Sequence, residues 1–126
     1  MYIFIKAMKA LSDETRIRIL NLLAERECCV CEVMQAMEIS QTRASRNLMI
    51  LHDAGFLKLR KEGLWSLYSL DKASLPEYLV KLVEGVESAL AQNSMAAMDK
   101  KRLKNSERIG FRSTNGICNR TGSNGI

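Results

Sequence analysis

The chain has 126 residues, of which 47% are hydrophobic and 26% are charged, and its formal net charge is +5. This length suits one domain and is too short for a catalytic and a regulatory domain side by side. No apolar run approaches the roughly 20 residues of a membrane span, and Lys6 interrupts the apolar N-terminus too early for a signal peptide. We therefore expect a cytoplasmic protein whose four cysteines are thiols or metal ligands rather than a disulfide framework.

The excess positive charge belongs to the C-terminal part of the sequence. Residues 1–98 carry twelve basic and twelve acidic side chains, whereas residues 99–126 carry seven basic and two acidic ones. Net charge is therefore no evidence that the folded part binds nucleic acid. The last 28 residues are rich in Asn, Gly, Ser and Arg, so they bury too little apolar surface to offset their ordering entropy. We expect one folded domain over residues 1–98 and a basic, disordered tail over residues 99–126.

Three helices are predicted in the first half of the chain. The run Ser12-Asp13-Glu14 is a capping sequence before an apolar repeat, so a helix should extend from there to about residue 26. A second helix should cover residues 30–37, where apolar residues recur at i, i+3, i+4, i+7 spacing. Ser40 is placed to cap a third helix, which should end at Gly55, a residue suited to the position after a helix.

Two strands and a further helix complete the pattern. Residues 56–60 and 65–70 are strand-like, and Gly63 between them suits the turn of a hairpin. Pro76 opens a last helix with an apolar stripe. Two adjacent helices followed by a hairpin predict a mainly α fold with a β-hairpin wing, the winged helix-turn-helix. In such a pair the second helix enters the major groove of DNA.

The third predicted helix has a polar face suited to DNA. At about 100° per residue, Ala44, Leu48 and Leu51 face inward, and Thr42 and Arg46 lie opposite them. Arginine pairs with guanine, and short polar side chains bind bases or phosphates. The alternative is an ordinary solvated helix face, which the helix-turn-helix context disfavours. The predicted DNA contacts are Ser40, Gln41, Thr42, Arg43, Ser45 and Arg46, with Arg60 and Lys61 of the wing.

Three cysteines crowd the start of the second predicted helix. Cys28, Cys29 and Cys31 lie within four residues, and soft ions such as trivalent arsenic and antimony select thiolate donors. A helix N-terminus also favours the thiolate form. In a regular helix Cys29 and Cys31 would point about 200° apart, so chelation by this pair requires the first turn to be absent or unwound. Cys28 and Cys31 could share an ion with the helix intact.

Other interpretations of the cysteines stay open. Buried cysteine often serves as a small hydrophobic residue. A structural zinc site needs four ligands, and Cys118 is the only further thiol. A bond between Cys29 and Cys31 would be strained, so oxidation should favour Cys28–Cys31 or a bond to Cys118. A thiol enzyme such as a reductase is disfavoured because the chain has one distant histidine, no Gly-rich phosphate loop and no Cys-x-x-Cys expected at a strand-to-helix turn, so we expect no enzymatic activity.

Four segments resemble the ArsR/SmtB family of metal-responsive repressors. They are KALSDETR at 9–16, ECCVCE at 27–32, SQTRASR at 40–46 and DAGFL at 53–57, and the resemblance covers roughly residues 5–95. It implies a dimeric winged helix whose first and last helices form the interface between two copies. It also implies a repressor that binds operator DNA at its own promoter, needs no constitutive cofactor and is released by metal.

The Cys-Val-Cys element is similar to that of the arsenic-responsive branch. The resemblance implies Cys29 and Cys31 as the core ligands, with As(III) or Sb(III) as the inducer. The position of the family's third cysteine holds Met34, so Cys28, Cys118 or an external thiol would supply a third sulfur. The resemblance also implies DNA contacts by Gln41, Thr42, Ser45 and Arg46, the last in place of a common histidine.

Two alternatives keep the repressor and change its signal. One is a response to thiol oxidation or persulfides, and the other is a response to cadmium or lead. The cadmium and lead branch adds N-terminal cysteines, and no cysteine precedes Cys28. The zinc branch uses histidine and carboxylates of the last helix, and residues 76–98 contain no histidine.

Overall fold

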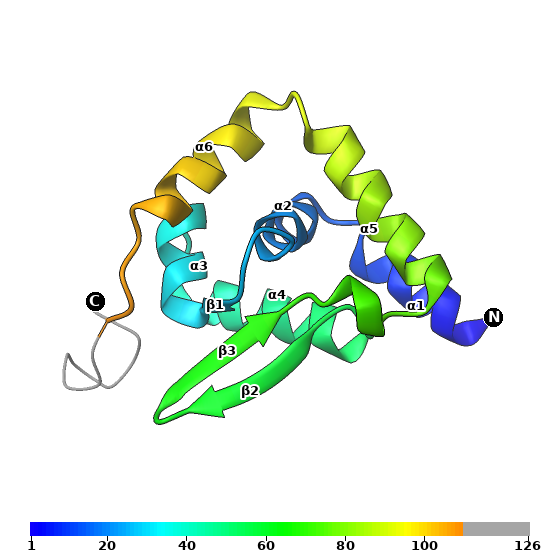
Figure 1. Cartoon of the computed structure of the whole chain (residues 1–126), viewed down its shortest axis with the longest axis horizontal. Helices are drawn as coiled ribbons and strands as arrows, with labels where there is room; N and C mark the ends of the chain where they lie inside the picture. The colour runs from blue at the N-terminus through cyan, green and yellow to red at the C-terminus, as the bar shows by residue number, and fades with distance from the viewer. Residues whose placement is uncertain (110–126) are drawn as a thin grey trace.

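A computed structural model describes residues 1–109 of the chain, as a set of helices with a small antiparallel sheet (Figure 1). Among these residues no helix is both long and apolar enough to cross a membrane. The elements in chain order are α1 (Tyr2–Ala10), α2 (Glu14–Leu23), β1 (Cys28–Cys29), α3 (Val30–Met37), α4 (Gln41–Asp53), β2 (Lys58–Glu62), β3 (Trp65–Ser69), a 3₁₀ turn (Lys72–Ser74), α5 (Glu77–Leu90) and α6 (Ser94–Lys104).

Helix α2 lies at the centre of the molecule, and the other helices surround it (Figure 1). Asp13 caps its start by accepting a hydrogen bond from the Arg16 backbone N–H at 3.1 Å, as the capping sequence predicts. The helix ends at Leu23, a little before the predicted limit. Ile17 of this helix is partly buried, and the other apolar side chains are fully buried, so α2 supplies much of the core against which the other helices pack.

Helices α3 and α4 form the predicted helix-turn-helix pair. Glu38 ends α3 in the left-handed conformation, with φ 56°. Two residues later the Ser40 hydroxyl accepts a hydrogen bond from the Arg43 N–H at 3.1 Å and caps α4. Gly55 follows α4 with φ 97°, a backbone conformation that favours glycine. Both predicted boundaries of α4 are therefore confirmed to within two residues.

The sheet joins the predicted hairpin to a short third strand. Strands β2 and β3 pair antiparallel, with Gly63 in their turn at φ 62°. Strand β1 adds to the other edge of β3, so that Cys28 lies opposite Tyr68 and Cys29 opposite Leu67. The sequence reasoning placed no strand at these cysteines. With the hairpin confirmed, the fold is a winged helix-turn-helix.

The last predicted helix is not the last in the structure. Helix α6 follows α5 and packs on α2 and α3, and the described chain continues to Ile109. The predicted boundary after residue 98 therefore falls inside a helix, and residues 99–109 are not a disordered tail. Apolar content is a poor guide here because a buried carboxylate holds the helix. Asp99 accepts hydrogen bonds from both Arg18 and Arg102. Residues 110–126 lie outside the described part.

Candidate thiol site and DNA-contact surface

Cys29 and Cys31 meet at the junction of β1 and α3. Helix α3 begins at Val30, and Cys29 precedes it with extended backbone, φ −85° and ψ 168°. The first helical turn that would separate the two side chains is therefore absent at Cys29, which is the condition that chelation by this pair requires. The Cα atoms are 5.4 Å apart and the Sγ atoms are joined as a disulfide. The expected Cys28–Cys31 bond is wrong, because Cys28 faces the main core while the extended backbone at Cys29 places its sulfur beside that of Cys31. The alternative bond to Cys118 falls outside the described residues.

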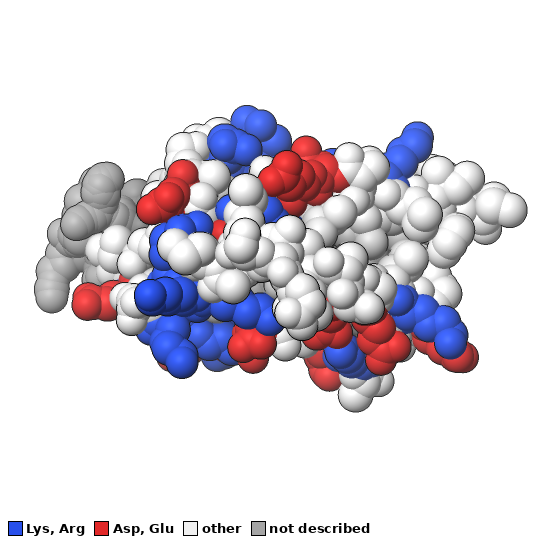
Figure 2. Space-filling view, turned by 90° about the horizontal axis from the view of Figure 1, so that it is seen from above, with Lys and Arg blue, Asp and Glu red and all other residues white. Residues whose placement is uncertain are grey.

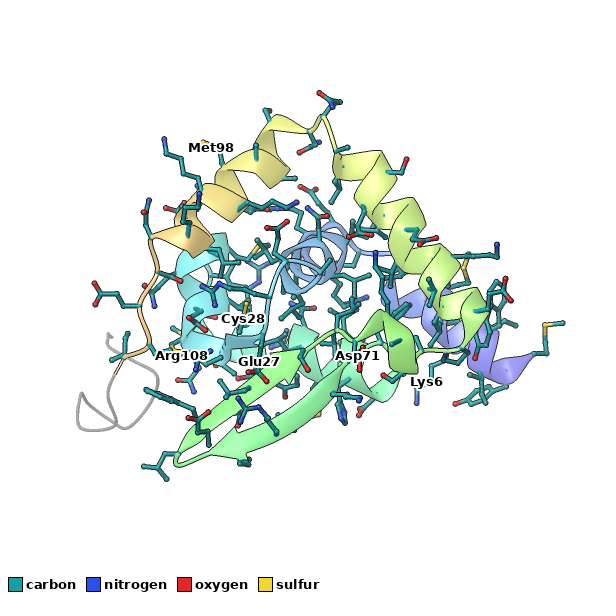
Figure 3. All side chains as sticks on the ribbon, in the orientation of Figure 1. Lys6, Glu27, Cys28, Asp71, Met98 and Arg108 are labelled. Carbon is teal, nitrogen blue, oxygen red and sulfur yellow. A yellow bond between two sulfur atoms is a disulfide. The ribbon has the colours of Figure 1, made fainter. Side chains whose placement is uncertain are left out.

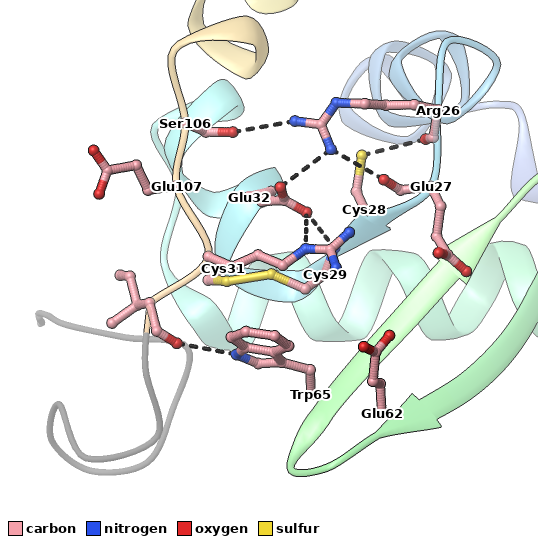
Figure 4. A network of polar contacts seen from close by, with 12 residues as sticks. Arg26, Glu27, Cys28, Cys29, Cys31, Glu32, Glu62, Trp65, Ser106 and Glu107 are labelled. Atoms are coloured by element: carbon pink, nitrogen blue, oxygen red, sulfur yellow. Dashed lines mark hydrogen bonds and ion pairs between the residues drawn. A yellow bond between two sulfur atoms is a disulfide. The ribbon is translucent and has the colours of Figure 1, made fainter.

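Cys28 points away from this pair. Neighbouring residues of a strand face opposite sides, so Cys28 enters the main core while Cys29 and Cys31 pack with Leu67 in a separate small cluster. Figure 3 shows Cys28 on the inner side of the molecule, and Figure 4 shows its sulfur directed toward Arg26. The thiol donates a 3.4 Å hydrogen bond to the Arg26 carbonyl oxygen, and burial raises its pKa to about 12.

Cys28 was a candidate for the third sulfur ligand, but the structure places it away from Cys29 and Cys31. Within residues 1–109, no group of three or more His, Cys, Asp or Glu side chains is arranged to hold a metal ion. The backbone of β1 would have to rotate to bring the Cys28 sulfur to Cys29 and Cys31. Cys118 lies outside the described residues. The described site is therefore a two-sulfur site.

Glu32 ties the thiol pair to its surroundings. Its side chain is 6% exposed, and its Oε1 accepts a 2.8 Å hydrogen bond from the Cys29 backbone N–H. The carboxylate also forms ion pairs with Arg26 at 3.1 Å and with Arg108 at 3.2 Å (Figure 4). A buried carboxylate needs such partners. The backbone at Cys29 is thus connected to the segment that follows α6.

Sequence reasoning missed the residues around the sulfurs. Glu32 has a recognisable signal, because an acidic residue three positions after an N-cap is the capping-box pattern. Trp65 and Ile109 pack against the cysteine cluster, and the Trp65 indole N–H donates a 3.0 Å hydrogen bond to the Ile109 carbonyl. The two residues are 44 positions apart. No local pattern could have paired them.

The predicted DNA-contact residues form one surface along α4. A shallow groove is lined by the following six residues: Gln41, Thr42, Ser45, Arg46, Met49 and Ile50. Four of these are predicted contacts. Arg43 lies beside the groove and donates a 3.2 Å hydrogen bond to the Thr15 hydroxyl, while Ser40 is used as the cap. The opposite face, with Ala44, Leu48 and Leu51, is buried as expected.

The two residues of the wing that were predicted to contact DNA, Arg60 and Lys61, have different surroundings. Arg60 forms a two-pronged ion pair with Glu27, with nitrogen–oxygen distances of 2.8 and 2.9 Å, and also contacts Glu62 at 3.2 Å. The hydrogen bond from Arg60 lowers the pKa of Glu27. Lys61 next to it is exposed. A DNA phosphate would therefore have to compete with Glu27 for Arg60. The sequence did not predict this ion pair.

Helix α1 presents a largely apolar surface, on which Lys6 and Lys9 are the charged residues. Its exposed large residues are Tyr2, Ile3, Phe4, Ile5 and Met8. The Phe4 ring meets Tyr78 of α5 edge-on, with centroids 5.9 Å apart. In Figure 2 this end of the molecule is mostly white, whereas blue side chains gather toward the opposite end. An apolar patch of this kind is typical of an interface.

These features define a class of protein. A helix-turn-helix pair with a wing and a polar groove on the second helix are the parts of a winged-helix DNA-binding regulator. Residues 13–59 match the model of the arsR family of bacterial regulatory proteins, and the chain belongs to this family.

Relatives of known name are similar to most of the chain. The arsenic resistance transcriptional regulator ArsR1 of Pseudomonas putida is 42% identical over 82 residues, which are 64% of this chain and 63% of that relative. A second such regulator of P. putida, ArsR2, is 41% identical over 102 residues, which are 77% of this chain and 83% of that one. A cadmium resistance transcriptional regulatory protein, a CadC homolog of Staphylococcus aureus, is 42% identical over 94 residues, 74% of this chain and 73% of its own.

A solved structure has the same fold. It is the homodimeric winged helix-turn-helix DNA-binding domain Mb0332 of Mycobacterium bovis, described as a possible ArsR-family regulator. It is 28% identical to this chain with a TM-score of 0.60, and the match covers 73% of this chain and 82% of that one.

Proposed function

We propose that this chain is a transcriptional repressor that binds operator DNA as a homodimer and is released when trivalent arsenic or antimony binds Cys29 and Cys31. One observation carries the proposal. Extended backbone at Cys29 brings its sulfur to that of Cys31, between wing strand β3 and the first helix of the DNA-binding pair. No catalytic step is assigned to the chain.

The chemistry fits a pair of reduced thiols. Arsenous acid condenses with each thiol to form an arsenic–sulfur bond, and each hydroxyl leaves with the thiol proton as water. Two thiols thus bind one arsenic atom and release two waters, with one hydroxyl left on arsenic. A third sulfur, from Cys118 or an external thiol, would displace that hydroxyl. Trivalent arsenic and antimony favour such soft donors.

The position of the site gives a physical route to DNA. Cys29 pairs with Leu67 of the wing, and Cys31 lies in the first turn of α3, which packs on α4. An ion that fixes the two sulfurs constrains both the wing and the helix that supports the DNA-contact surface. By reciprocity, an ion that weakens DNA binding is itself bound more weakly by the DNA complex.

The DNA and the second copy are assigned to different surfaces. The groove along α4 carries Gln41, Thr42, Ser45 and Arg46, which suit base edges and phosphates. The exposed apolar residues of α1, with Tyr78 of α5, suit the interface between two copies. Support for a dimer also comes from the homodimeric relative of known structure.

A second candidate keeps the repressor but changes the signal to thiol oxidation. The observation that favours it is the disulfide between Cys29 and Cys31, at an ordinary Cα separation of 5.4 Å. Oxidation of the pair by one hydrogen peroxide would form the sulfur–sulfur bond, and the two thiol protons and two electrons would convert the peroxide to two waters. The same two residues would then report oxidation rather than arsenic.

The experiment is an operator titration. Labelled DNA from upstream of the chain's own coding region is saturated with reduced protein, and arsenite, antimonite, cadmium and peroxide are then added separately. We expect arsenite and antimonite to release the DNA. The double variant Cys29→Ser, Cys31→Ser should bind the same DNA and stay bound, whereas Cys28→Ser, the neighbour in β1, should respond like the wild type.

Each outcome separates the candidates. Failure of arsenite to release the wild type, or full release of the double variant, contradicts the arsenic proposal. Release by peroxide alone supports the oxidation candidate, and release by cadmium alone supports a cadmium sensor. An absence of binding to any DNA would contradict the repressor itself.

A further inference from the structure

The described chain after α6 crosses the thiol site. We name residues 105–109 the C-terminal strap. Ile109 packs against the small cluster of Cys29, Cys31 and Leu67, and both cysteines are almost fully covered, at 0% and 1% exposure. An ion bound to both sulfurs needs space and an approach path that this covered arrangement does not offer.

The end of the strap is held by residues of the site itself. The Arg108 Nε donates to the Glu32 Oε1 at 3.2 Å, and its guanidinium lies over the Trp65 ring, 5.7 Å from the centroid. The Trp65 indole N–H donates to the Ile109 carbonyl at 3.0 Å (Figure 4). All three contacts therefore depend on the start of α3 or of β3, the two elements that flank the sulfurs.

A second set of contacts holds the strap nearer to α6. Gln35 donates to the Glu107 carbonyl at 2.7 Å and accepts from the Glu107 N–H at 3.2 Å. The same Gln35 amide nitrogen donates to the Cys31 carbonyl at 3.0 Å. Arg26 donates to the Leu103 carbonyl and to the Ser106 hydroxyl. The strap is thus docked along its length on groups that adjoin the thiol pair.

We propose that the C-terminal strap is the outer wall of the thiol site, and that its release is required before a thiophilic ion can bind. Arg108 and Ile109 are then positioning residues that set the inducer concentration to which the protein responds. This inference rests on the proposed function for its ligand. The covering of the thiols by the strap is independent of it.

One oxygen atom of Glu32 couples the thiol pair to the strap. Its Oε1 accepts hydrogen bonds from both the Cys29 N–H and Arg108. A change of the Cys29 backbone on ion binding disturbs the carboxylate that holds Arg108, and undocking of Arg108 loosens the hold on Cys29. The apparent affinity for an ion equals the intrinsic affinity multiplied by the fraction of molecules with the strap released. Weakening the strap should therefore strengthen apparent binding.

The first test measures thiol access without any arsenic. Reduced protein is treated with iodoacetamide, and fragment mass spectrometry follows Cys29 and Cys31 separately from Cys28 and Cys118. Arg108→Ala should speed modification of the pair by about tenfold, the factor for one charge-assisted hydrogen bond. Ile109→Ser should act in the same direction. Lys101→Ala, an exposed residue of α6, is the control and should match the wild type. Equal rates in all four proteins overturn the proposal.

The second test uses the chain's single tryptophan. Trp65 emission should move to longer wavelength when arsenite binds, because the strap leaves the indole, and Arg108→Ala should show part of this shift beforehand. The same variant should bind arsenite with about tenfold higher apparent affinity. Arsenite binding with unchanged emission and unchanged affinity in Arg108→Ala overturns the strap as a wall. Faster alkylation with no arsenite binding supports the strap and contradicts the arsenic ligand.

Discussion

Two adjacent cysteines of β1 have opposite surroundings because a strand alternates its side chains. Cys29 joins Cys31 beside the strap, and Cys28 lies in the main core near the Arg26 carbonyl. The sequence shows three thiols in four residues and does not distinguish them. The structure separates the Cys29–Cys31 pair from a thiol of the main core, and burial raises the pKa of Cys28 to about 12.

This difference predicts that Cys28 contributes an alkaline dependence of stability. The pKa of Cys28 is raised from 9.0 to about 12. Below about pH 9 the thiol is neutral in both states, so its contribution is fully present. As the pH rises toward 12, the unfolded chain loses this proton while the folded chain keeps it, so stability falls by at most about 1.4 kcal/mol per pH unit.

The measurement is urea unfolding of the wild type and Cys28→Ala at pH 8 and at pH 10. We expect a smaller loss of unfolding free energy for Cys28→Ala over this interval, although its stability at pH 8 is lower because of the cavity. Burial also raises the pKa of Tyr68, and this tyrosine is present in both proteins. Parallel losses in the two proteins would show that Cys28 ionises as easily in the folded state as in the unfolded one.

At the scale of elements, α6 is held by charge rather than by apolar area. Asp99 is 1% exposed and accepts two hydrogen bonds from Arg18 of α2, at 2.7 and 2.8 Å. Arg102, one turn further along α6, adds a third at 3.0 Å. The pairing raises the pKa of Arg18. These contacts, with buried Leu103, position the start of the strap beside α3.

Removal of this carboxylate should therefore release α6. Asp99→Ala leaves Arg18 and Arg102 without their shared partner, and we expect a loss of about 3 kcal/mol in the free energy of unfolding, measured by urea denaturation. The matched control is Glu77→Ala, which removes a carboxylate from the exposed pair with Lys81. It should change stability by less than about 1 kcal/mol. Similar values for the two variants would mean that α6 is not anchored through Asp99.

The extent of prediction differs between elements for a physical reason. Local sequence signals were sufficient to predict α4 and the hairpin. Ser40 caps the start of α4, and Gly55 and Gly63 adopt the positive φ angles that end the helix and form the turn. Helix α6 depends on an ion pair that spans 81 positions, which composition does not reveal. The thiol pair was predicted conditionally, through the need for an absent first turn. Its covering by Ile109 again depends on a distant contact.

For the whole molecule, the β1–α3 junction that carries the thiol pair and helix α1 lie on opposite sides of α2 (Figure 1). The described chain begins at α1 and ends in the strap, and α4, the helix proposed to contact DNA, packs on both α1 and α3. A dimer formed through α1 thus leaves both thiol sites at the outside. It also brings two copies of α4 into a fixed relation, which binding to two half-sites of an operator requires.

The arrangement predicts which apolar surface joins two copies. Ile3 of α1 and Met98 of α6 are both strongly exposed in one chain, at 61% and 50%, and Figure 3 shows Met98 on the outside of α6. Ile3→Glu places two like charges in a symmetric interface, one from each copy, so light scattering should show monomers where the wild type is a dimer. The affinity of Ile3→Glu for operator DNA should fall as the dimer is lost.

Met98→Glu adds the same charge at a similarly exposed residue and should leave the dimer and its operator affinity intact. Size and operator binding measured at equal protein concentration compare the two variants directly. A dimeric Ile3→Glu together with a monomeric Met98→Glu would move the interface to α6. In that case the strap would lie near the second copy, and the thiol sites would face the interface between the two chains instead of the solvent.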